Sequence, residues 1–520
     1  MKINVLFLLL FSLAAQSLRA QATPPIIPLP GSYQEVTGSF LLDSKTTVYI
    51  NDPSFSDEAL FLQKILFDMK RLPLSIQSQP GSRSISLLKE NRAGNNKEGY
   101  SLKMSPKGVT LSAGDKEGIF RGITSLLHLI SASEDNSISC WNIEDAPRYE
   151  WRGFMLDESR HFFGKEKVKQ LLDWMAFYKL NRFHWHLTDE PGWRIEIKKY
   201  PLLGYIGGIG NHSDSDAAPQ FYTQEEIREI VQYAAERKIV VIPEIDMPGH
   251  ARAANRAYPQ FSGGGSERYP EFTFDPGNEG TYQYLTDILK EVNVLFPSEM
   301  IHLGGDEVHF GNEAWNHNEG IKTLMAKHNL KDLPQVEKYF MVRMADSLFA
   351  MNNKILAWDE MADISLPSEK TLIFWWRHDQ PAQLEKALEK DYKVVLCPRI
   401  PYYFDFVQDS THAVGRRWSG DFADLKKAYS FTPEKWVKGG RLEQVVGMQA
   451  NLWTEVIATP ARFEFMTFPR ITALSEAAWG QNNDYDDYLE RLKLQIPLYE
   501  KGDLYFFNPF NVSQTPEPKR

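Results

Sequence analysis

The feature that most constrains the fold of this chain is a regular alternation of strand-like and helix-like segments after residue 147. Short apolar runs read as buried strands, and most are followed by amphipathic stretches with helical spacing, such as 165–178, 223–238 and 281–295. This alternation is typical of parallel βαβ units, and eight such units predict a (β/α)8 barrel, the TIM-barrel architecture. The eight strand candidates are 151–156, 182–187, 239–245, 300–303, 354–358, 372–376, 393–396 and 445–452.

The segments on either side of this repeat give the domain boundaries. Residues 23–146 predict a small α+β domain, with strands at 47–50, 84–88 and 108–111 and helices at 57–70 and 118–131. The sequence Asp145-Ala146-Pro147 has the turn residues of a joint. We therefore expect an α/β chain in which the α+β domain precedes a barrel at 147–485, followed by a C-terminal extension at 486–520.

Residues 1–22 have the pattern of a signal peptide. Lys2 supplies positive charge, residues 5–15 are nearly all apolar, and the small residues Ala20 and Ala22 offer cleavage points. The apolar run is too short to span a membrane, and no later stretch approaches the roughly 20 apolar residues that a membrane helix needs. The sequence therefore predicts an exported protein, periplasmic or secreted, without stable membrane insertion.

Composition narrows the class of partner. The formal net charge of -10 disfavours nucleic acid or an anionic membrane, since both would repel the surface. The 13 Trp, 22 Tyr and 31 Phe fit either a large core or a carbohydrate site in which rings stack on sugars. Cys140 and Cys397 are the two cysteines; the sequence does not decide whether they pair, although two free thiols are favoured.

Nearly every strand candidate ends in acidic, polar or aromatic residues. In barrels of this kind the active site lies at the carboxyl ends of the strands. Carboxylates are costly to bury without partners, so their accumulation at these ends favours a functional site over solvated loops or helix caps. The segments concerned are 157–160, 186–190, 244–246, 304–307, 358–360 and 453–455.

The strongest local signal is the sequence His302-Leu303-Gly304-Gly305-Asp306-Glu307. Two glycines allow a sharp turn and a close approach of a ligand. Two adjacent carboxylates push their pKa values apart, so that one can stay protonated as an acid while the other stays ionised. The plainer interpretation is an Asp-Glu helix cap after a glycine turn.

Residues 302–307 are similar to the signature of the β-N-acetylhexosaminidases of glycoside hydrolase family 20, and so are 151–161, 184–189 and 243–250. The resemblance extends from about residue 24 to residue 480 and keeps the order of motifs in the family. It implies an N-terminal α/β domain before a catalytic barrel. It also implies an exo-acting, retaining enzyme that releases terminal N-acetylglucosamine or N-acetylgalactosamine from β-linked oligosaccharides or glycoconjugates, with no cofactor or metal.

The resemblance also assigns catalytic roles. In this family the acetamido oxygen of the substrate attacks the anomeric carbon, and an oxazolinium ion forms and is opened by water. By resemblance, Glu307 protonates the leaving oxygen and then activates the water, while Asp306 stays ionised and orients the acetamido N–H. Tyr403 would donate its hydroxyl to the acetamido oxygen. Asp189 and His250 would form a hydrogen-bonded relay with Glu307 that tunes the acid.

Three charged residues are expected to close the far end of the sugar. The guanidinium of Arg160 suits two neighbouring sugar hydroxyls, which the resemblance implies are O3 and O4; the alternative is a structural ion pair. Glu455 is expected to accept from O4 and Asp405 from O6. Closure at this end is the physical reason to expect release of one sugar at a time.

Three tryptophans near strand ends, Trp358, Trp376 and Trp453, are expected to enclose the acetamido methyl group and stack under the sugar. A single tryptophan at such a place is often part of the core. The adjacent Trp375 is the alternative to Trp376.

Three other functions remain open. A metal-dependent hydrolase would use His184 and His186, which point the same way on a strand. An inert sugar-binding protein should lack Asp306, Glu307 or Tyr403, and a disaccharide-releasing enzyme needs an open pocket. The sequence does not decide between gluco and galacto substrates, the natural glycan, the linkage, the oligomeric state or the final location.

Overall fold

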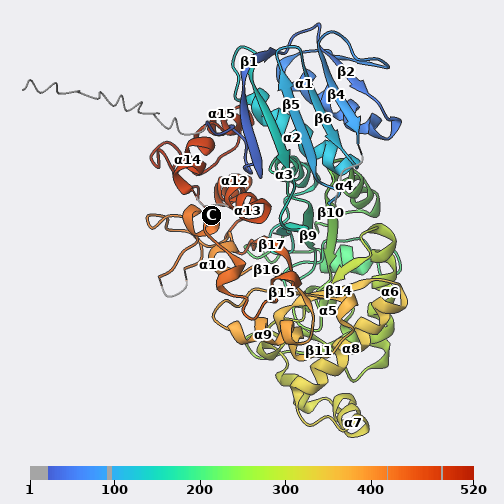
Figure 1. The fold of residues 1–520 in the computed structure, drawn as a ribbon. Coiled ribbons are helices and arrows are strands. Elements are labelled where there is room, and N and C mark those ends of the chain that lie inside the picture. Colours follow the sequence, from blue (N-terminus) through green and yellow to red (C-terminus); the bar gives the residue numbers. More distant parts are fainter. Residues whose placement is uncertain (1–21, 91–95, 418–419, 482–483, 520) are drawn as a thin grey trace, which may run out of the picture.

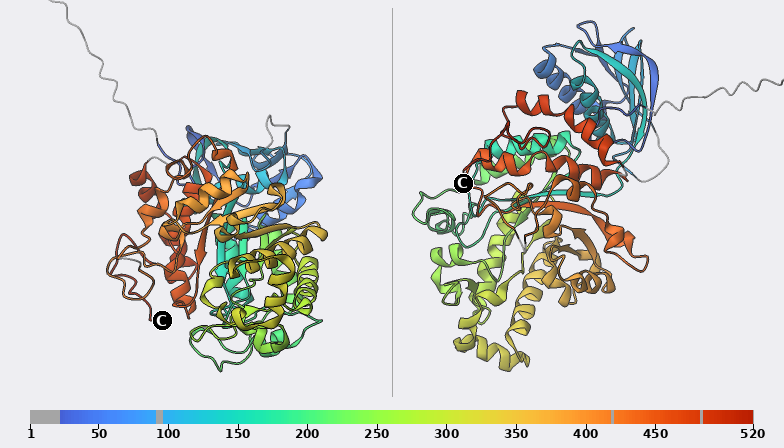
Figure 2. Two further views of the ribbon diagram at one scale, coloured as in Figure 1. Left: turned by 90° about the horizontal axis from the view of Figure 1, so that it is seen from below. Right: turned by 90° about the vertical axis from the view of Figure 1, so that its left-hand side faces the viewer.

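The computed structural model describes residues 22–90, 96–417, 420–481 and 484–519, so the predicted signal peptide lies, except for its last residue, outside the described residues. Two domains are visible in Figure 1: an N-terminal domain, in blue, at one end of a larger barrel domain. The views in Figure 2 show the C-terminal helices, in red, beside the N-terminal domain.

The N-terminal domain is a seven-stranded mixed sheet in the order β1-β7-β5-β6-β4-β2-β3. Helices α1 (Ser56–Lys70) and α2 (Lys116–Ser131) pack against it. Nearly all residues of α2 are buried because this helix also contacts the barrel domain, where Arg121 donates to the carbonyl of Lys238. The strands are β1 (Ser32–Leu41), β2 (Thr47–Ile50), β3 (Ser75–Gln77), β4 (Ser84–Lys89), β5 (Tyr100–Ser105), β6 (Gly108–Ala113) and β7 (Ser137–Asp145).

The second domain is a closed barrel of eight parallel strands, in the order β10-β13-β14-β15-β16-β17-β8-β9, so the predicted fold is confirmed. Each of the eight strand candidates overlaps a barrel strand. The strands are β8 (Trp151–Asp157), β9 (Arg182–His186), β10 (Val240–Glu244), β13 (Met300–His302), β14 (Lys354–Trp358), β15 (Thr371–Trp375), β16 (Lys393–Leu396) and β17 (Val445–Leu452). A separate two-stranded sheet pairs β11 (Ser262–Gly264) with β12 (Thr273–Phe274).

Helices cover the outside of the barrel, and their apolar faces meet the strands in one large core. Helix α4 (Gln224–Glu236) begins with a capping box, in which Thr223 and Glu226 satisfy each other's backbone N–H groups. Strands β14 and β15 are joined by the 3-10 turns η6 (Asp359–Asp363) and η7 (Ser368–Lys370). The main helices are α3 (Lys165–Phe177), α4 (Gln224–Glu236), α5 (Arg252–Ala257), α6 (Glu279–Leu295), α7 (Glu319–His328), α8 (Leu333–Ala350), α9 (Pro381–Glu389), α10 (Arg399–Tyr402), α11 (Leu425–Tyr429), α12 (Pro460–Thr467) and α13 (Arg470–Trp479).

The N-terminal domain contacts the barrel at the ends where strands begin. Glu98 accepts from Arg121 at 2.8 Å and from Arg152, at the start of β8, at 2.6 Å. Burial would raise the pKa of Glu98, but these two guanidiniums lower it to about 2. Lys179, just before β9, lies 3.0 Å from Asp145 of β7. This interface leaves the opposite face of the barrel, where the strands end, free for a site.

The C-terminal segment packs along the barrel domain. Helices α14 (Tyr485–Lys493) and α15 (Ile496–Lys501) are followed by a tail in which Glu517 pairs with Arg462 at 2.8 Å. Cys140 and Cys397 are both buried and unpaired. Among the described residues, no helix combines the length and the apolar character that crossing a membrane requires.

Candidate active site

A small pocket of about 90 Å³ opens at the face of the barrel where the strands end. Nine of the eleven residues that the sequence singled out line it. Trp358 and Asp405, which were expected to contact the sugar, lie behind the wall and are fully buried. The lining residues are Arg160, Asp189, His250, Asp306, Glu307, Trp376, Arg399, Tyr403, Phe406, Arg416, Trp453 and Glu455.

The two adjacent carboxylates follow β13 after a glycine turn. Gly304 and Gly305 have φ values of 66° and 87°, and Glu307 itself is held in the left-handed region at φ 54°. A Cβ on Gly304 would lie 1.8 Å from Oδ1 of Asp246. The glycine is therefore needed because a buried aspartate approaches the turn, and not only because a ligand does.

His250 faces both carboxylates: its Nε2 lies 3.8 Å from Oδ2 of Asp306 and 3.8 Å from Oε2 of Glu307. Burial raises the pKa of Asp306 to about 7, with His250 lowering it and Glu307 raising it further. Asp246 lies beside this pair, and burial together with the charge of Asp306 raises its pKa well above the usual range. Because Asp246 stays protonated, Asp306 is the one of these two aspartates that ionises near neutral pH.

Asp189 lies behind His250 and accepts from its Nδ1 at 3.0 Å. Its second oxygen accepts from Nε2 of His186 at 2.9 Å and lies 2.7 Å from Nη1 of Arg160. Burial would raise the pKa of Asp189, but the charges of Arg160 and His250 and the bonds from both histidines hold it well below its usual range. Conversely, burial would lower the pKa of His250, but Asp189 raises it well above 6.5.

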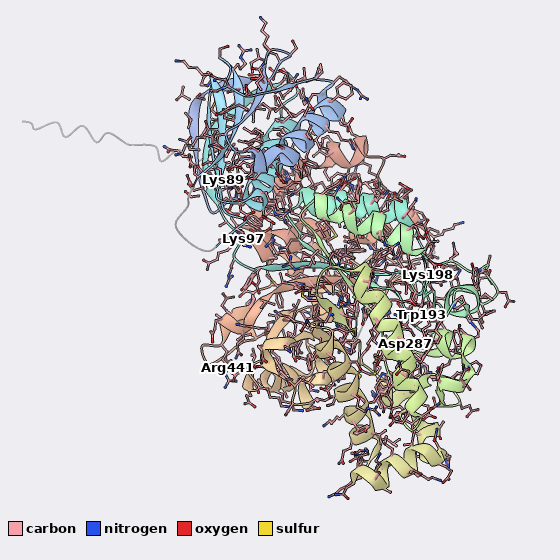
Figure 3. The ribbon with its side chains drawn as sticks, turned by 90° about the vertical axis from the view of Figure 1, so that its right-hand side faces the viewer. Lys89, Lys97, Trp193, Lys198, Asp287 and Arg441 are labelled. Carbon is pink, nitrogen blue, oxygen red and sulfur yellow. The ribbon has the colours of Figure 1, made fainter. Side chains whose placement is uncertain are left out.

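The turn that carries Asp189 is fixed by the chain that follows β9. The amide of Asp189 donates to the carbonyl of Gly192 at 3.2 Å, and Thr188 forms an antiparallel bridge with Trp193. Trp193, labelled in Figure 3, is buried, and its indole N–H donates to the carbonyl of Ile195 at 2.7 Å. A buried tryptophan thus anchors the loop on which the relay depends.

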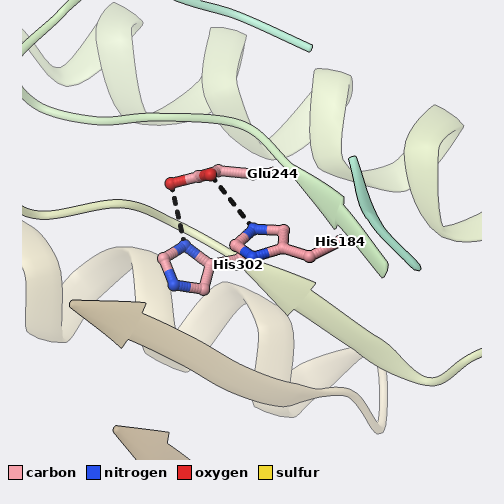
Figure 4. A group of neighbouring side chains, drawn as sticks. All are labelled: His184, Glu244 and His302. Carbon is pink, nitrogen blue, oxygen red and sulfur yellow. Dashed lines mark ion pairs between the residues drawn. The ribbon is translucent and has the colours of Figure 1, made fainter. Parts of the chain in front are cut away.

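Below the pocket, the carboxylate of Glu244 is surrounded by nitrogen atoms. Figure 4 shows it between His184 of β9 and His302 of β13, whose ring nitrogens are each 3.0 Å from a carboxylate oxygen. His186 Nδ1 lies 2.6 Å away, and the indole N–H of Trp358 donates at 2.9 Å. Burial would raise the pKa of Glu244, but the histidines, His186 first, hold it well below its usual range.

The group His184, Glu244 and His302 has the residue types of a metal site, and its ligand atoms lie within 4.8 Å of one another. The donor chemistry fits a hydrogen-bonded network better. Gln449 donates to Nδ1 of His184 at 3.0 Å, which leaves the Nε2 of this ring to carry its proton toward Glu244. Glu244 already accepts hydrogen bonds from Nδ1 of His186 and from the indole N–H of Trp358, so a cation would have to displace bonds that the chain itself provides.

Three charged residues form one side of the pocket. Arg160 lies 3.4 Å from Asp157 as well as 2.7 Å from Asp189, so it is both paired and aimed at the pocket. Glu455 forms an ion pair with Arg416, whose Nε is 2.9 Å from Oδ2 of Asp405. Asp405 therefore contacts Arg416, which lines the pocket, and does not line the pocket itself.

Aromatic rings form another part of the wall. Trp376 and Tyr403 are stacked, with ring centroids 6.2 Å apart and an interplanar angle of 9°. The ring centroids of Trp453 and Tyr403 are 6.1 Å apart. The guanidinium of Arg160 lies 5.1 Å from the ring centroid of Trp453. Burial raises the pKa of Tyr403 well above 10, so its hydroxyl stays protonated and can donate.

A carboxylate pair, a histidine relay and stacked rings at this face of a barrel are the parts of a glycosidase, and comparisons with known proteins agree. Residues 149–482 match the family described as glycosyl hydrolase family 20, catalytic domain, and residues 23–146 match glycosyl hydrolase family 20, domain 2. The chain belongs to glycosyl hydrolase family 20.

Relatives in this family include curated proteins and solved structures. A β-hexosaminidase of Porphyromonas gingivalis is 33% identical over 90% of this chain, which spans 62% of that protein's length. A β-N-acetylhexosaminidase of Cellulomonas fimi is 28% identical, with 92% of this chain and 94% of that protein covered. The family 20 exo-β-N-acetylglucosaminidase of Vibrio harveyi, solved with N-acetylglucosamine, has a TM-score of 0.86 at 32% identity and covers 94% of this chain and 80% of its own. The chain is thus a glycoside hydrolase of the β-N-acetylhexosaminidase family.

Sequence reasoning missed several residues of this family 20 site. Arg416 lies in the long connection between β16 and β17, where an isolated arginine carries no signal of its own. Glu244, His186 and His302 lie within recognised motifs, but their roles as a supporting network follow only from the contacts between strands. The signal that could have found them is a set of ionisable residues at the ends of three neighbouring strands.

Proposed function

We propose that this family 20 hydrolase is an exo-acting, retaining β-N-acetylhexosaminidase that works with the assistance of its substrate's acetamido group. The observation that carries the proposal is that Asp306 and Glu307 are consecutive residues of one turn after β13, both line the pocket, and both lie 3.8 Å from Nε2 of His250. A retaining glycosidase with its own nucleophile places that carboxylate across the sugar from the acid, about 5 Å away. Family 20 is among the known exceptions that use the substrate instead.

Each residue then has a task in the reaction. Glu307, whose side chain is about one-third exposed, protonates the leaving oxygen and afterwards activates water. Ionised Asp306 accepts from the acetamido N–H and balances the positive oxazolinium. Tyr403 donates to the acetamido oxygen, and holding this group over the anomeric carbon removes much of the entropic barrier.

The shape of the site supports release of one terminal sugar. Arg160, Arg416 and Glu455 line the pocket and are held in ion pairs with neighbouring residues. A larger cleft of about 860 Å³ adjoins the pocket and shares Arg160, His250, Glu307, Arg416 and Glu455 with it. A small pocket for one sugar and an adjoining cleft with room for the leaving group fit an exo-acting enzyme.

The deciding experiment measures hydrolysis of p-nitrophenyl N-acetyl-β-glucosaminide in EDTA beside the 2-hydroxy glucoside that lacks the acetamido group. We expect turnover of the first substrate only, and a product that keeps the β-configuration. Comparable turnover of both would mean that a protein carboxylate is the nucleophile. Loss of activity in EDTA would support the metal-dependent alternative at His184, Glu244 and His302.

We propose in addition that the protein is exported, because residues 1–22 resemble a signal peptide. The N-terminal sequence of the mature protein tests this: it should begin close to Ala22.

A further inference from the structure

The cleft that adjoins the pocket has an unusual charge for this protein. Its wall includes Arg252, Arg256 and Arg268. Among the residues that the structure describes, none of the ion pairs involves these three side chains, whereas the other two arginines of the cleft, Arg160 and Arg416, are paired. Positive charge without an ion-pair partner, in a chain of net charge -10, favours an anionic ligand in the cleft.

Two of the three guanidiniums are held on one face of helix α5. Arg252 and Arg256 are four residues apart, one turn of the helix, so their side chains project the same way. Arg256 is fixed by bonds from its guanidinium to the carbonyls of Ile206, Gly207 and Ile209. Partial burial and the positive charge of Arg252 lower the pKa of Arg256, so two like charges are kept together without a carboxylate between them.

The acidic groups of the cleft do not neutralise these arginines. Glu455 is paired with Arg416, and Glu190 lies 3.6 Å from the ring of His250, which the relay keeps charged. Glu307 is the proposed acid and is neutral when it protonates the leaving group. The cleft therefore presents net positive charge to whatever is attached to the scissile oxygen.

An aromatic surface lies beside the arginines. Tyr269 and Phe310 are stacked, with centroids 5.8 Å apart and an interplanar angle of 19°, and Phe310 follows Glu307 by only three residues. The guanidinium of Arg268 lies 5.3 Å from the centroid of the Tyr269 ring. Such rings pack against the apolar face of a sugar, while neighbouring guanidiniums bind carboxylate or sulfate oxygens through paired N–H donors.

We propose that the leaving-group side of the substrate carries an anionic sugar, bound in this cleft by Arg252 and Arg268, while Arg256 adds positive charge beside them. The inference rests on the proposed function, because it assumes that Glu307 separates the released sugar from its leaving group. The ligand chemistry is an oxyanion on the sugar next to the scissile bond, which a hexuronate carboxylate or a sulfate ester can supply.

Two matched substrate pairs test the proposal with the full chain. The first pair is GlcNAc β-linked to methyl glucuronoside or to methyl glucoside, which differ only in the carboxylate. The second is GlcNAc β-linked to methyl galactoside with or without a 6-sulfate. We expect at least one anionic substrate to exceed its neutral partner in kcat/KM by about tenfold, and the ratio to shrink when ionic strength rises from about 0.01 M to about 1 M. A preference within only one pair identifies the source of the oxyanion.

Arg252→Gln and Arg268→Gln should each lower this ratio by about fivefold. The matched control is Arg228→Gln, since Arg228 is an exposed arginine on α4 paired with Glu225 outside the cleft, and it should leave the ratio unchanged. Hydrolysis of p-nitrophenyl N-acetyl-β-glucosaminide without any preference for anionic partners would overturn the inference and leave the proposed function standing, as would a preference that survives both substitutions. Failure to hydrolyse the aryl glycoside would instead refute the proposed function.

Discussion

Two clusters of ionisable side chains lie close together at the face of the barrel where the strands end, and they differ in how completely their polar atoms are paired. The supporting network consists of Asp189, Glu244 and the neighbours of Glu244, which are His184, His186, His302 and Trp358. In it, each carboxylate oxygen has nitrogen neighbours at 2.6 to 3.0 Å. In the pocket above it, Oδ1 of Asp306, Nε2 of His250 and Oε2 of Glu455 are buried without a hydrogen-bond partner among the described residues.

This difference separates the residues that hold the site from those that bind the substrate. Buried polar atoms are normally hydrogen-bonded, so unpaired atoms that face a cavity mark the places where a ligand supplies the partner. The carboxylates of the supporting network, in contrast, already face nitrogen atoms of the chain, and the network acts by fixing Asp189 and His250. Substitutions in the two clusters should therefore fail in different ways: the pocket should lose activity and the network should lose stability.

The largest expected effect is that of Glu307→Gln in the pocket. Loss of the acid should lower kcat/KM for a GlcNAc disaccharide by about 10²- to 10⁴-fold, because its sugar leaving group must be protonated. The p-nitrophenyl glycoside has a better leaving group and should lose less. The unfolding free energy should change by less than about 0.5 kcal/mol, since the side chain is partly exposed. Equal losses on both substrates would argue against the acid role.

Glu244→Gln should mainly lower the stability of the protein, in contrast to Glu307→Gln, which should mainly lower its activity. It removes the negative charge that balances His186 and leaves N–H donors facing an amide, which should lower the unfolding free energy by about 3–5 kcal/mol in urea. Glu229→Gln is the matched control, because Glu229 is an exposed partner of Lys165 and Lys169, and it should leave the urea midpoint nearly unchanged.

The pH dependence of this loss follows from the pKa of Glu244, which lies well below its usual range. The stabilising contribution is fully present above the unfolded value of about 4.3 and is lost as the pH falls through the folded pKa. The difference between Glu244→Gln and the original chain should therefore shrink in acid. A difference that is constant from neutral to strongly acidic pH would contradict an ionised Glu244.

These differences also explain what could be predicted from the sequence. The barrel was predictable because each strand is a local apolar run, and the signature around Asp306 and Glu307 is contiguous. How deeply a side chain is buried depends on residues that are distant in the sequence. Trp358 and Trp376 both lie near strand ends, but of these two only Trp376 lines the pocket, because the indole N–H of Trp358 donates to the buried Glu244. The pairing of Arg416 with Asp405 depends on the path of a long loop, which no pattern in the sequence specifies.

An intermediate effect is expected from the titration of Asp306, whose pKa burial raises to about 7. The reaction needs the ionised form, so kcat/KM should fall as the pH drops below about 7. The raised pKa of Asp306 has the opposite pH dependence for folding stability, which is greater at low pH. The folded state holds this proton more tightly than the unfolded state, so folding loses stability as the pH rises from about 4 to about 7. Asp306→Asn should remove this loss and raise the Tm more at pH 8 than at pH 5; an equal change at both values would contradict the raised pKa.

The smallest effects are expected for Trp358→Phe and Trp376→Phe. Comparing these two substitutions tests which of the two clusters each tryptophan belongs to. Trp358 is fully buried and donates to the ionised Glu244, so its loss should lower the unfolding free energy by about 1–3 kcal/mol while KM changes little. Trp376 lines the pocket, so Phe there should raise KM for the aryl glycoside with a smaller cost in stability. If instead Trp358→Phe raises KM as strongly as Trp376→Phe does, then Trp358 contacts the acetamido group as the family resemblance implies. The wall of the pocket would then have to open during binding to expose a ring that now belongs to the supporting network.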